Sequence, residues 1–244
     1  MTPNAQSIAL WLSASFAVVL AVAFVLFPGF FPPMSPEMSA SEVSEFYSDN
    51  TTMIRASMIV FDFCGVMLVP LFMVIVHQMK RMATSTDVFA YCYLSAAVSG
   101  VTLFAVANLF WLIAAFRPER DAELILLLND VAWMTFVAPV GAIIAQNLCL
   151  ALAVHLDQRP TPVFPRWVGH FNLGIALTIA PSACAAVFKS GPLAWDGLIS
   201  FWLHFGAYGL YIVVMFFVLR QAIRREASEI GEAVDAVLLQ PVAP

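Results

Sequence analysis

Charged side chains are scarce in this sequence. Asp, Glu, Lys and Arg make up 11% of its 244 residues and hydrophobic residues 61%, whereas soluble domains carry about 25% charged and roughly 45 to 50% apolar residues. Because a soluble fold cannot bury so much apolar surface, the composition predicts an integral membrane protein. The basic residues form no patch with interleaved aromatic residues outside the apolar runs, so we expect no nucleic-acid partner.

The signatures of common enzyme classes are missing as well. The sequence holds no Walker loop, dinucleotide-binding glycine motif, nucleophile elbow or kinase motif set, and it predicts no cofactor. Its cysteines stand singly without a C-x-x-C pair, which argues against a redox dithiol or a structural zinc site. We expect them to pack as small hydrophobic side chains; they are Cys64, Cys92, Cys149 and Cys184.

What is present is a series of long apolar runs, which predicts an all-α bundle of six transmembrane helices. A helix of about 20 apolar residues crosses roughly 30 Å of hydrocarbon, and no run shows the strict alternation of a transmembrane strand. The predicted spans cover about residues 8–31, 53–79, 88–116, 128–154, 167–188 and 197–220. Residues 1–220 would then form one bundle, and residues 221–244 a cytoplasmic amphipathic tail that lies on the membrane surface or binds a partner protein.

The distribution of basic residues predicts the orientation of this bundle. Lys and Arg are enriched in the cytoplasmic loops of membrane proteins. Seven of the eleven Lys and Arg residues lie at the ends of the spans on the side of both termini, and the loop between the first two spans, on the other side, is acidic. We therefore expect the N- and C-termini to be cytoplasmic.

Proline and a capping pattern predict where helices begin and break. Pro70, Pro139 and Pro181 fall inside the second, fourth and fifth spans, and each removes a backbone hydrogen bond, so we expect a kink at each position. Ser39 and Glu42 have the spacing of a capping box, which predicts a short helix before the second span.

The acid Asp62 stands out within the apolar stretch MIVFDFCGVMLVP, residues 58–70. At 1.5 Å per residue it falls near the middle of the second span, where insertion of a carboxylate costs roughly 2.5 to 3.5 kcal/mol. We therefore expect this side chain to face neighbouring helices and to have a polar partner. Burial there would favour the protonated, hydrogen-bonding form of the acid.

Polar and aromatic residues of other spans fall in the same outer half of the bundle, and they predict a cavity for an amphipathic small molecule. The polar members are Arg55, Asp62, Asn108, Asn129, Asp130 and His204. The aromatic members, which follow the polar ones at helical spacing and would form the floor of the cavity, are Trp111, Trp133, Tyr208 and Tyr211. In this interpretation the polar end of the ligand meets Asp62 and His204, and the apolar body lies among the aromatic rings.

Most of these residues also have a purely structural interpretation. Polar residues between membrane helices commonly hydrogen-bond to one another, with a contribution of about 0.6 kcal/mol each, and Asn108 and Asn129 fit that role. His204 fits equally well the role of a buried histidine whose hydrogen bonds are formed within the protein. Asp130 fits a helix start near the lipid headgroups.

A metal site on the cytoplasmic side is a weaker alternative. His77, His155 and His170 lie at similar depth, and imidazole is a common ligand of transition metals. The sequence lacks the H-x-x-x-H or E-x-x-H spacing of helical metal sites, and snorkelling at the interface explains the three histidines more simply. We expect no bound metal.

Residues 160–220 resemble part of a group of bacterial integral membrane proteins. The resemblance rests on the segments PRWVGHFNLGIALTIAP and KSGPLAWDGLISFWLHF. It implies a multi-pass protein of the bacterial inner membrane. Since no activity is established for that group, it implies nothing about chemistry.

Three functions are therefore open from the sequence. The first is binding or transport of a hydrophobic or amphipathic small molecule, with Asp62 as the polar anchor and membrane lipids as the surroundings. The second is an accessory subunit of a larger membrane complex, recruited through the tail. The third is an intramembrane isomerase or cyclase in which Asp62 and His204 act as an acid/base pair on a lipid-like substrate.

Overall fold

The structure, a computed structural model, describes residues 1–238 and shows an all-α architecture without strands for that part of the chain. The main helices are α1 (Pro3–Leu26), α2 (Ala40–Val66), α3 (Val69–Met79), α4 (Val88–Phe116), α5 (Ala122–Val137), α6 (Gly141–Leu156), α7 (Arg166–Ile179) and α8 (His204–Leu238). Between α7 and α8 lie a 3₁₀ helix, η1 (Ala180–Ala186), and a π-helix, η2 (Leu198–Leu203). Within residues 1–238, six helical stretches are long and apolar enough to cross a membrane, which confirms the predicted six-span bundle.

The first span lies a few residues earlier in the chain than predicted. The hydroxyl of Thr2 caps α1 by accepting the N–H of Ala5 at 3.3 Å, and the helix ends at Leu26 rather than near residue 31. The chain turns at Gly29, whose φ of 75° is a left-handed conformation that favours glycine. A Cβ atom at Gly29 would lie 2.6 Å from the ring of Phe46, so this turn is packed tightly against the start of α2.

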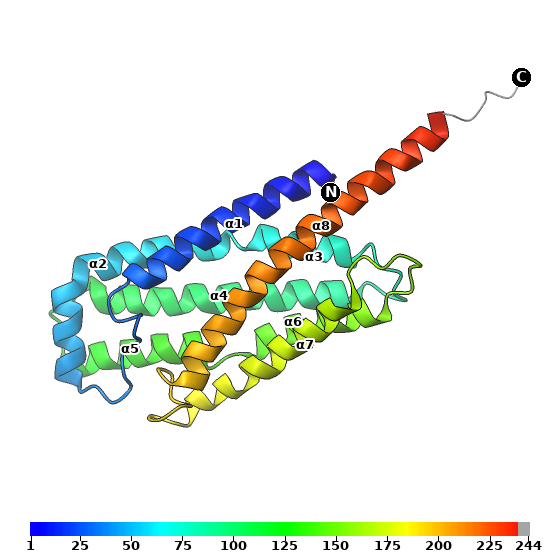
Figure 1. Ribbon diagram of the computed structural model, residues 1–244. Helices are drawn as coiled ribbons and strands as arrows, with labels where there is room; N and C mark the ends of the chain where they lie inside the picture. Colours follow the sequence, from blue (N-terminus) through cyan, green and yellow to red (C-terminus); the bar gives the residue numbers. More distant parts are fainter. Residues whose placement is uncertain (239–244) are drawn as a thin grey trace, which may run out of the picture.

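The predicted capping box at the start of α2 is confirmed. The N–H of Ser39 donates to Oε2 of Glu42 at 2.7 Å, and the N–H of Glu42 donates to Oγ of Ser39 at 3.4 Å. The helix then runs without interruption from Ala40 to Val66. The predicted short helix and the second span are therefore one helix, which is bent near its beginning (Figure 1).

Each of the three predicted proline positions coincides with a break in a span. α2 ends shortly before Pro70, α5 ends shortly before Pro139, and α7 gives way to η1 immediately before Pro181. The physical reason is the missing N–H of proline and the clash of its ring with the preceding turn. Three of the six spans are thus divided into two helical segments at a proline, and the last span combines η2 with α8.

Ser13 of α1 hydrogen-bonds to two backbone groups at the break between α2 and α3. Its hydroxyl donates to the carbonyl oxygen of Met67 at 2.9 Å and accepts the N–H of Leu71 at 3.0 Å, and the side chain is fully buried. In a bilayer no water can replace these bonds. Ser13 therefore stabilises the break and ties α1 to it.

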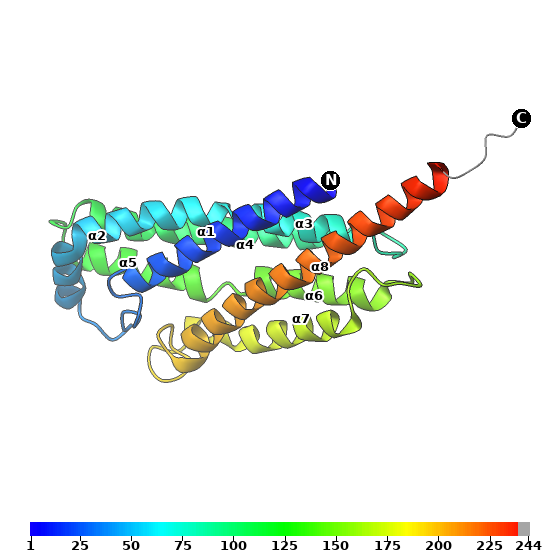
Figure 2. The same ribbon diagram turned by 45° about the horizontal axis from the view of Figure 1, so that its top comes forward.

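α4 contacts four other helices on one side and is exposed on the other. It packs against α2, α3, α5 and α6, while α7 packs against α6, and α1 contacts α8. Figures 1 and 2 show α1 and α8 close together at the end that carries the N-terminus and diverging toward the opposite end. The two helices therefore flank a wedge-shaped region on one side of the bundle.

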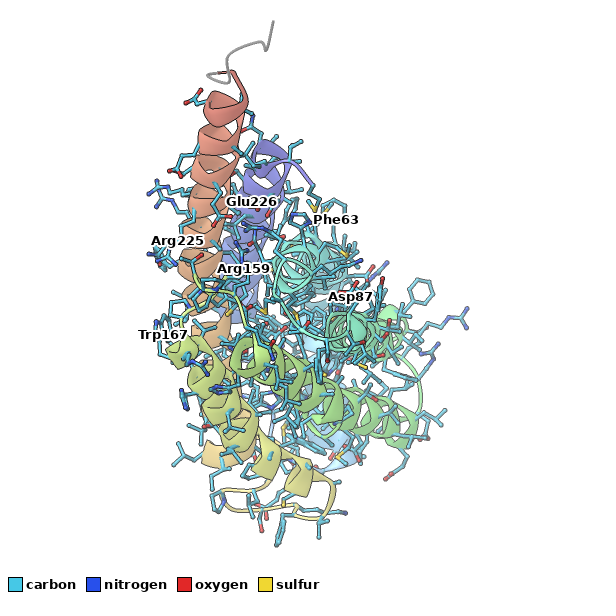
Figure 3. All side chains as sticks on the ribbon, turned by 90° about the vertical axis from the view of Figure 1, so that its right-hand side faces the viewer. Phe63, Asp87, Arg159, Trp167, Arg225 and Glu226 are labelled. Carbon is cyan, nitrogen blue, oxygen red and sulfur yellow. The ribbon has the colours of Figure 1, made fainter. Side chains whose placement is uncertain are left out.

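A polar network joins α1, α3 and α8 at the end of the bundle near the N-terminus. The carboxylate of Glu226, which is 7% exposed, accepts hydrogen bonds from Nε2 of Gln6 at 3.0 Å and from Nε2 of Gln78 at 2.8 Å. His77 and Arg81 each place a nitrogen 3.3 Å from the same carboxylate. Figure 3 shows Glu226 on the side of α8 that faces α1.

The predicted tail of residues 221–244 is not a separate helix as far as it is described. Up to Leu238 it continues α8 directly, and Figure 1 shows this part of α8 leaving the bundle. Residues 239–244 lie outside the described residues. Binding of a partner through this segment stays a prediction.

Candidate functional site

Asp62 lies on the outer surface of the bundle. The residues of α2 that face other helices in this region are Ile54, Met58, Phe61 and Gly65. Their spacing defines the inward stripe of the helix, and Asp62 falls outside it beside Phe63, which is 57% exposed and lies at the periphery of the bundle in Figure 3. The expectation that this carboxyl group faces neighbouring helices is therefore wrong for the single chain.

Measured along the helix axes, Asp62 is nevertheless close to the middle of the bundle. Gly65, three residues further on, approaches Phe104 near the centre of α4 so closely that a Cβ atom at this glycine would lie 2.6 Å from the ring. Arg55, expected to reach toward the acid, lies instead over the ring of Phe116 at 5.4 Å. None of the ion pairs in the described part of the chain involves Asp62. In lipid, an ionised acid at this depth costs roughly 2.5 to 3.5 kcal/mol.

Trp111 and Trp133 meet in space but are part of the packed core. Both side chains are fully buried, and their ring centroids are 5.1 Å apart. Phe30, from the loop after α1, lies 5.0 Å from the ring of Trp133 and 5.6 Å from that of Trp111. These rings form an aromatic core at the loop end of the bundle, and they do not line the cavity described below.

Asn108 of α4 and Asn129 and Asp130 of α5 do not line the cavity described below either. Oδ1 of Asn129 accepts a hydrogen bond from the buried hydroxyl of Tyr47 at 3.0 Å, which joins α5 to α2 as the structural interpretation expects. Asn108 is 2% exposed, and its side-chain amide has no hydrogen-bond partner among residues 1–238. Asp130 is partly exposed at the same end of the bundle.

A cavity of about 630 Å³ lies in the interior of the bundle. Residues of α1 to α6, η2 and α8 line it, and most are apolar. Small residues form part of its lining, among them Gly65 on α2 and Ala97 and Gly100 on α4. Among the predicted site residues, His204 and Tyr208 contribute to the lining.

The cavity reaches the outer surface of the bundle between α1 and α8. Its lining includes Val18 of α1, which is 64% exposed, and Val213 of α8, which is 54% exposed. These side chains would face acyl chains in a membrane. The cavity is therefore open sideways, toward the lipid.

Two aromatic pairs between α1 and α8 bound this opening. The rings of Phe24 and Phe205 are 4.9 Å apart at one end, and those of Trp11 and Phe216 are 5.0 Å apart at the other. Along α1 the two contacts are separated by roughly 20 Å at 1.5 Å per residue. Between them the opening has no bridging aromatic pair in the described part of the chain, and Gly209 of α8 lies at its edge.

The polar groups of the lining come from α5, α6, η2 and α8. They are Thr135, Gln146, Ser200, His204 and Tyr208. Gln146 is held in place behind the wall, because its Nε2 donates to the hydroxyl of Tyr93 at 2.8 Å and to that of Tyr211 at 3.3 Å. The two tyrosine hydroxyls are themselves 2.6 Å apart. Tyr211, predicted as part of the floor, thus lies in a buried network that supports the wall.

The histidines expected as weak metal ligands do not form one site. The rings of His155 and His170 lie 4.7 Å apart, but His77 pairs with Glu226 on α8. Among the described residues, no group of three or more His, Cys, Asp or Glu side chains is placed to hold a metal ion.

Sequence reasoning missed most of the lining. The side chains of α1 and α4 that leave the space open are Ala, Gly and Val, which are common in any transmembrane helix and give no signal. Gln146 is the exception, because an amide in the middle of an apolar span is a recognisable polar position.

Comparisons with known proteins add no assignment. No protein-family model, curated protein or solved structure matches the chain. The resemblance of residues 160–220 to a group of bacterial membrane proteins therefore stays a prediction.

Proposed function

We propose that this chain is a bacterial inner-membrane protein with cytoplasmic termini that binds or transports a hydrophobic or amphipathic small molecule in the cavity between α1, α4 and α8. The observation that carries the proposal is the cavity itself. Its volume of about 630 Å³ lies in the range of small-molecule sites, roughly 300 to 1,000 Å³, and its lining combines an apolar wall with a few polar groups as such sites do.

The sideways opening supports a ligand that comes from the bilayer. A molecule dissolved in acyl chains can pass between Val18 and Val213 without crossing a polar surface, because both exposed side chains are apolar. A ligand with one polar end can place it near His204, Ser200 and Gln146 while its chain lies along the apolar wall. Asp62 has no place in this proposal, since it lies outside the cavity.

The other two functions have less support. An acid/base pair of Asp62 and His204 would require the two side chains to meet, but Asp62 is on the outer surface of α2 and His204 is in the cavity wall. Recruitment into a larger complex through the tail rests on the sequence pattern of α8 beyond the bundle.

Two glycines of α8 allow a matched test. Gly209 lines the cavity, whereas Gly206, one turn earlier, does not, and an added Cβ atom meets nothing within 4 Å at either position. We expect the parent protein, purified in detergent, to bind palmitate or a long-chain alcohol saturably. Gly209→Trp should weaken binding at least tenfold, while Gly206→Trp should leave it unchanged. Equal binding by the parent and both variants would contradict the proposal.

A further inference from the structure

The outer face of α2 carries a polar side chain at a depth where the protein surface would contact acyl chains. Asp62 is exposed near mid-depth, and its closest basic neighbour along this face, Arg55, is turned onto the ring of Phe116 at 5.4 Å. A carboxyl group in hydrocarbon needs a hydrogen-bonding partner. Among the described residues, no ion pair of this chain provides one.

The residues around Asp62 have the spacing of a helix–helix seam. Exposed residues recur on this face at alternating steps of three and four, and they are Thr52, Arg55, Ile59, Asp62 and Val66. Ile59 is 66% exposed and Val66 49% exposed. A repeat of this kind brings one side of a helix repeatedly against a parallel partner, and a single polar residue within such a seam fixes the register of the pair.

We propose that a second copy of this chain packs in parallel against this face of α2, with the two Asp62 carboxyl groups opposite each other at a two-fold axis. Two copies inserted with the same orientation have their Asp62 residues at the same depth. A helix of another protein could pair with Asp62 only if it carried its own polar residue at that depth. A carboxyl group that keeps its proton donates O–H to the carboxyl oxygen of its partner, so the two residues satisfy each other. Such an isologous contact closes as a dimer.

The proposed interface and the cavity use different surfaces. The seam consists of outward residues of α2, whereas the cavity is lined by inward residues such as Gly65 and opens between α1 and α8. The dimer would therefore leave the opening free, and it does not depend on whether the cavity binds a ligand.

Single-molecule photobleaching tests the proposal on the full chain. The protein, labelled with one fluorophore per copy, is reconstituted at high dilution into phosphatidylethanolamine–phosphatidylglycerol vesicles, and bleaching steps are counted. We expect two steps for the parent protein and for Asp49→Leu, a control that removes an exposed acid from the start of the same helix. Asp62→Leu should lower the ratio of dimer to monomer at least tenfold. A monomeric parent protein, or an Asp62→Leu variant as dimeric as the parent, would overturn the proposal.

Disulfide crosslinking gives a second readout in which Asp62 is kept. With the four native cysteines replaced by alanine, single cysteines are placed at Ile59 in the seam and at Leu177 of α7, which are 66% and 67% exposed. Oxidation in vesicles should crosslink the Ile59→Cys chains at least tenfold faster than the Leu177→Cys chains. Similar rates at the two positions would show that collisions are random, and the proposed interface would be wrong.

Discussion

Nε2 of Gln6 donates a hydrogen bond of 3.0 Å to Oε2 of Glu226 and so joins the first helix of the bundle to the last. Gln78 donates to the same oxygen at 2.8 Å, and Arg81 lies 3.3 Å from it. This contact holds α1 and α8 together beyond the end of the opening that Trp11 and Phe216 close. The network thus joins the two helices at one end of the opening.

Removal of the Glu226 carboxylate should destabilise the protein clearly. Glu226→Ala removes the shared charged acceptor of Gln6, Gln78 and Arg81, which keep only their other acceptors. We therefore expect a loss of about 2 to 3 kcal/mol in the free energy of unfolding. For a chain of this size that corresponds to a fall in Tm of roughly 5 to 10 °C, which thermal denaturation in detergent would measure.

Glu232 on the same helix provides the control for this prediction. Its carboxylate is exposed and contacts only Ser228 in the described structure, at 3.3 Å. Glu232→Ala should therefore change Tm by no more than about 1 to 2 °C. If both variants unfold like the parent protein, the network does not hold the helices together.

Ser13 should be far more important for stability than Ser15, although both lie on α1. The Ser13 hydroxyl bonds two backbone groups at the break between α2 and α3, whereas the Ser15 hydroxyl bonds only the carbonyl of Trp11 in its own helix, at 3.0 Å. We expect Ser13→Ala to reduce the free energy of unfolding by about 1 to 3 kcal/mol, and Ser15→Ala to be nearly neutral. Equal Tm values for the two variants would contradict this role.

The affinity for a ligand with a polar end should depend on His204. This side chain lines the cavity and can hydrogen-bond to a carboxyl or hydroxyl group. His204→Leu should weaken binding of palmitate about two- to tenfold, since a net hydrogen bond contributes roughly 0.5 to 1.5 kcal/mol. It should leave binding of a hydrocarbon of equal length unchanged. Titration calorimetry with both ligands in detergent would measure the difference, and parallel losses for both would argue for a purely structural His204.

The sequence predicts where the helices of this protein begin and end better than it predicts which face of each helix points into the bundle. Hydropathy indicates the six spans, Pro70, Pro139 and Pro181 indicate their breaks, and Ser39 indicates the start of α2, because each of these signals is local. Which face of a span points inward is not local. The part of α2 around Asp62, residues 58–66, is apolar on nearly all sides. No stripe in this part of the sequence shows that Phe61 is buried and Asp62 is exposed.

The sequence predicts a cavity for a small molecule inside the bundle, but it does not predict which residues line that cavity. The prediction joined polar residues of similar depth, such as Asp62 and Asn108, on the assumption that they point toward one another. The space arises instead where small side chains from several helices face each other, and helix packing alone decides where that occurs. His204 and Tyr208 were identified because they are polar or aromatic residues that happen to lie on this wall.

The most direct test is to ask where a lipid's acyl chain can reach. A fatty acid with a photoactivatable group on its chain is incorporated into vesicles with the protein, irradiated, and its adducts are located by mass spectrometry. We predict adducts on interior lining residues such as Leu71, which is 1% exposed, and their loss in Gly209→Trp but not in Gly206→Trp. Adducts confined to outward residues such as Leu177, in all three proteins alike, would contradict a cavity that takes up molecules from the membrane.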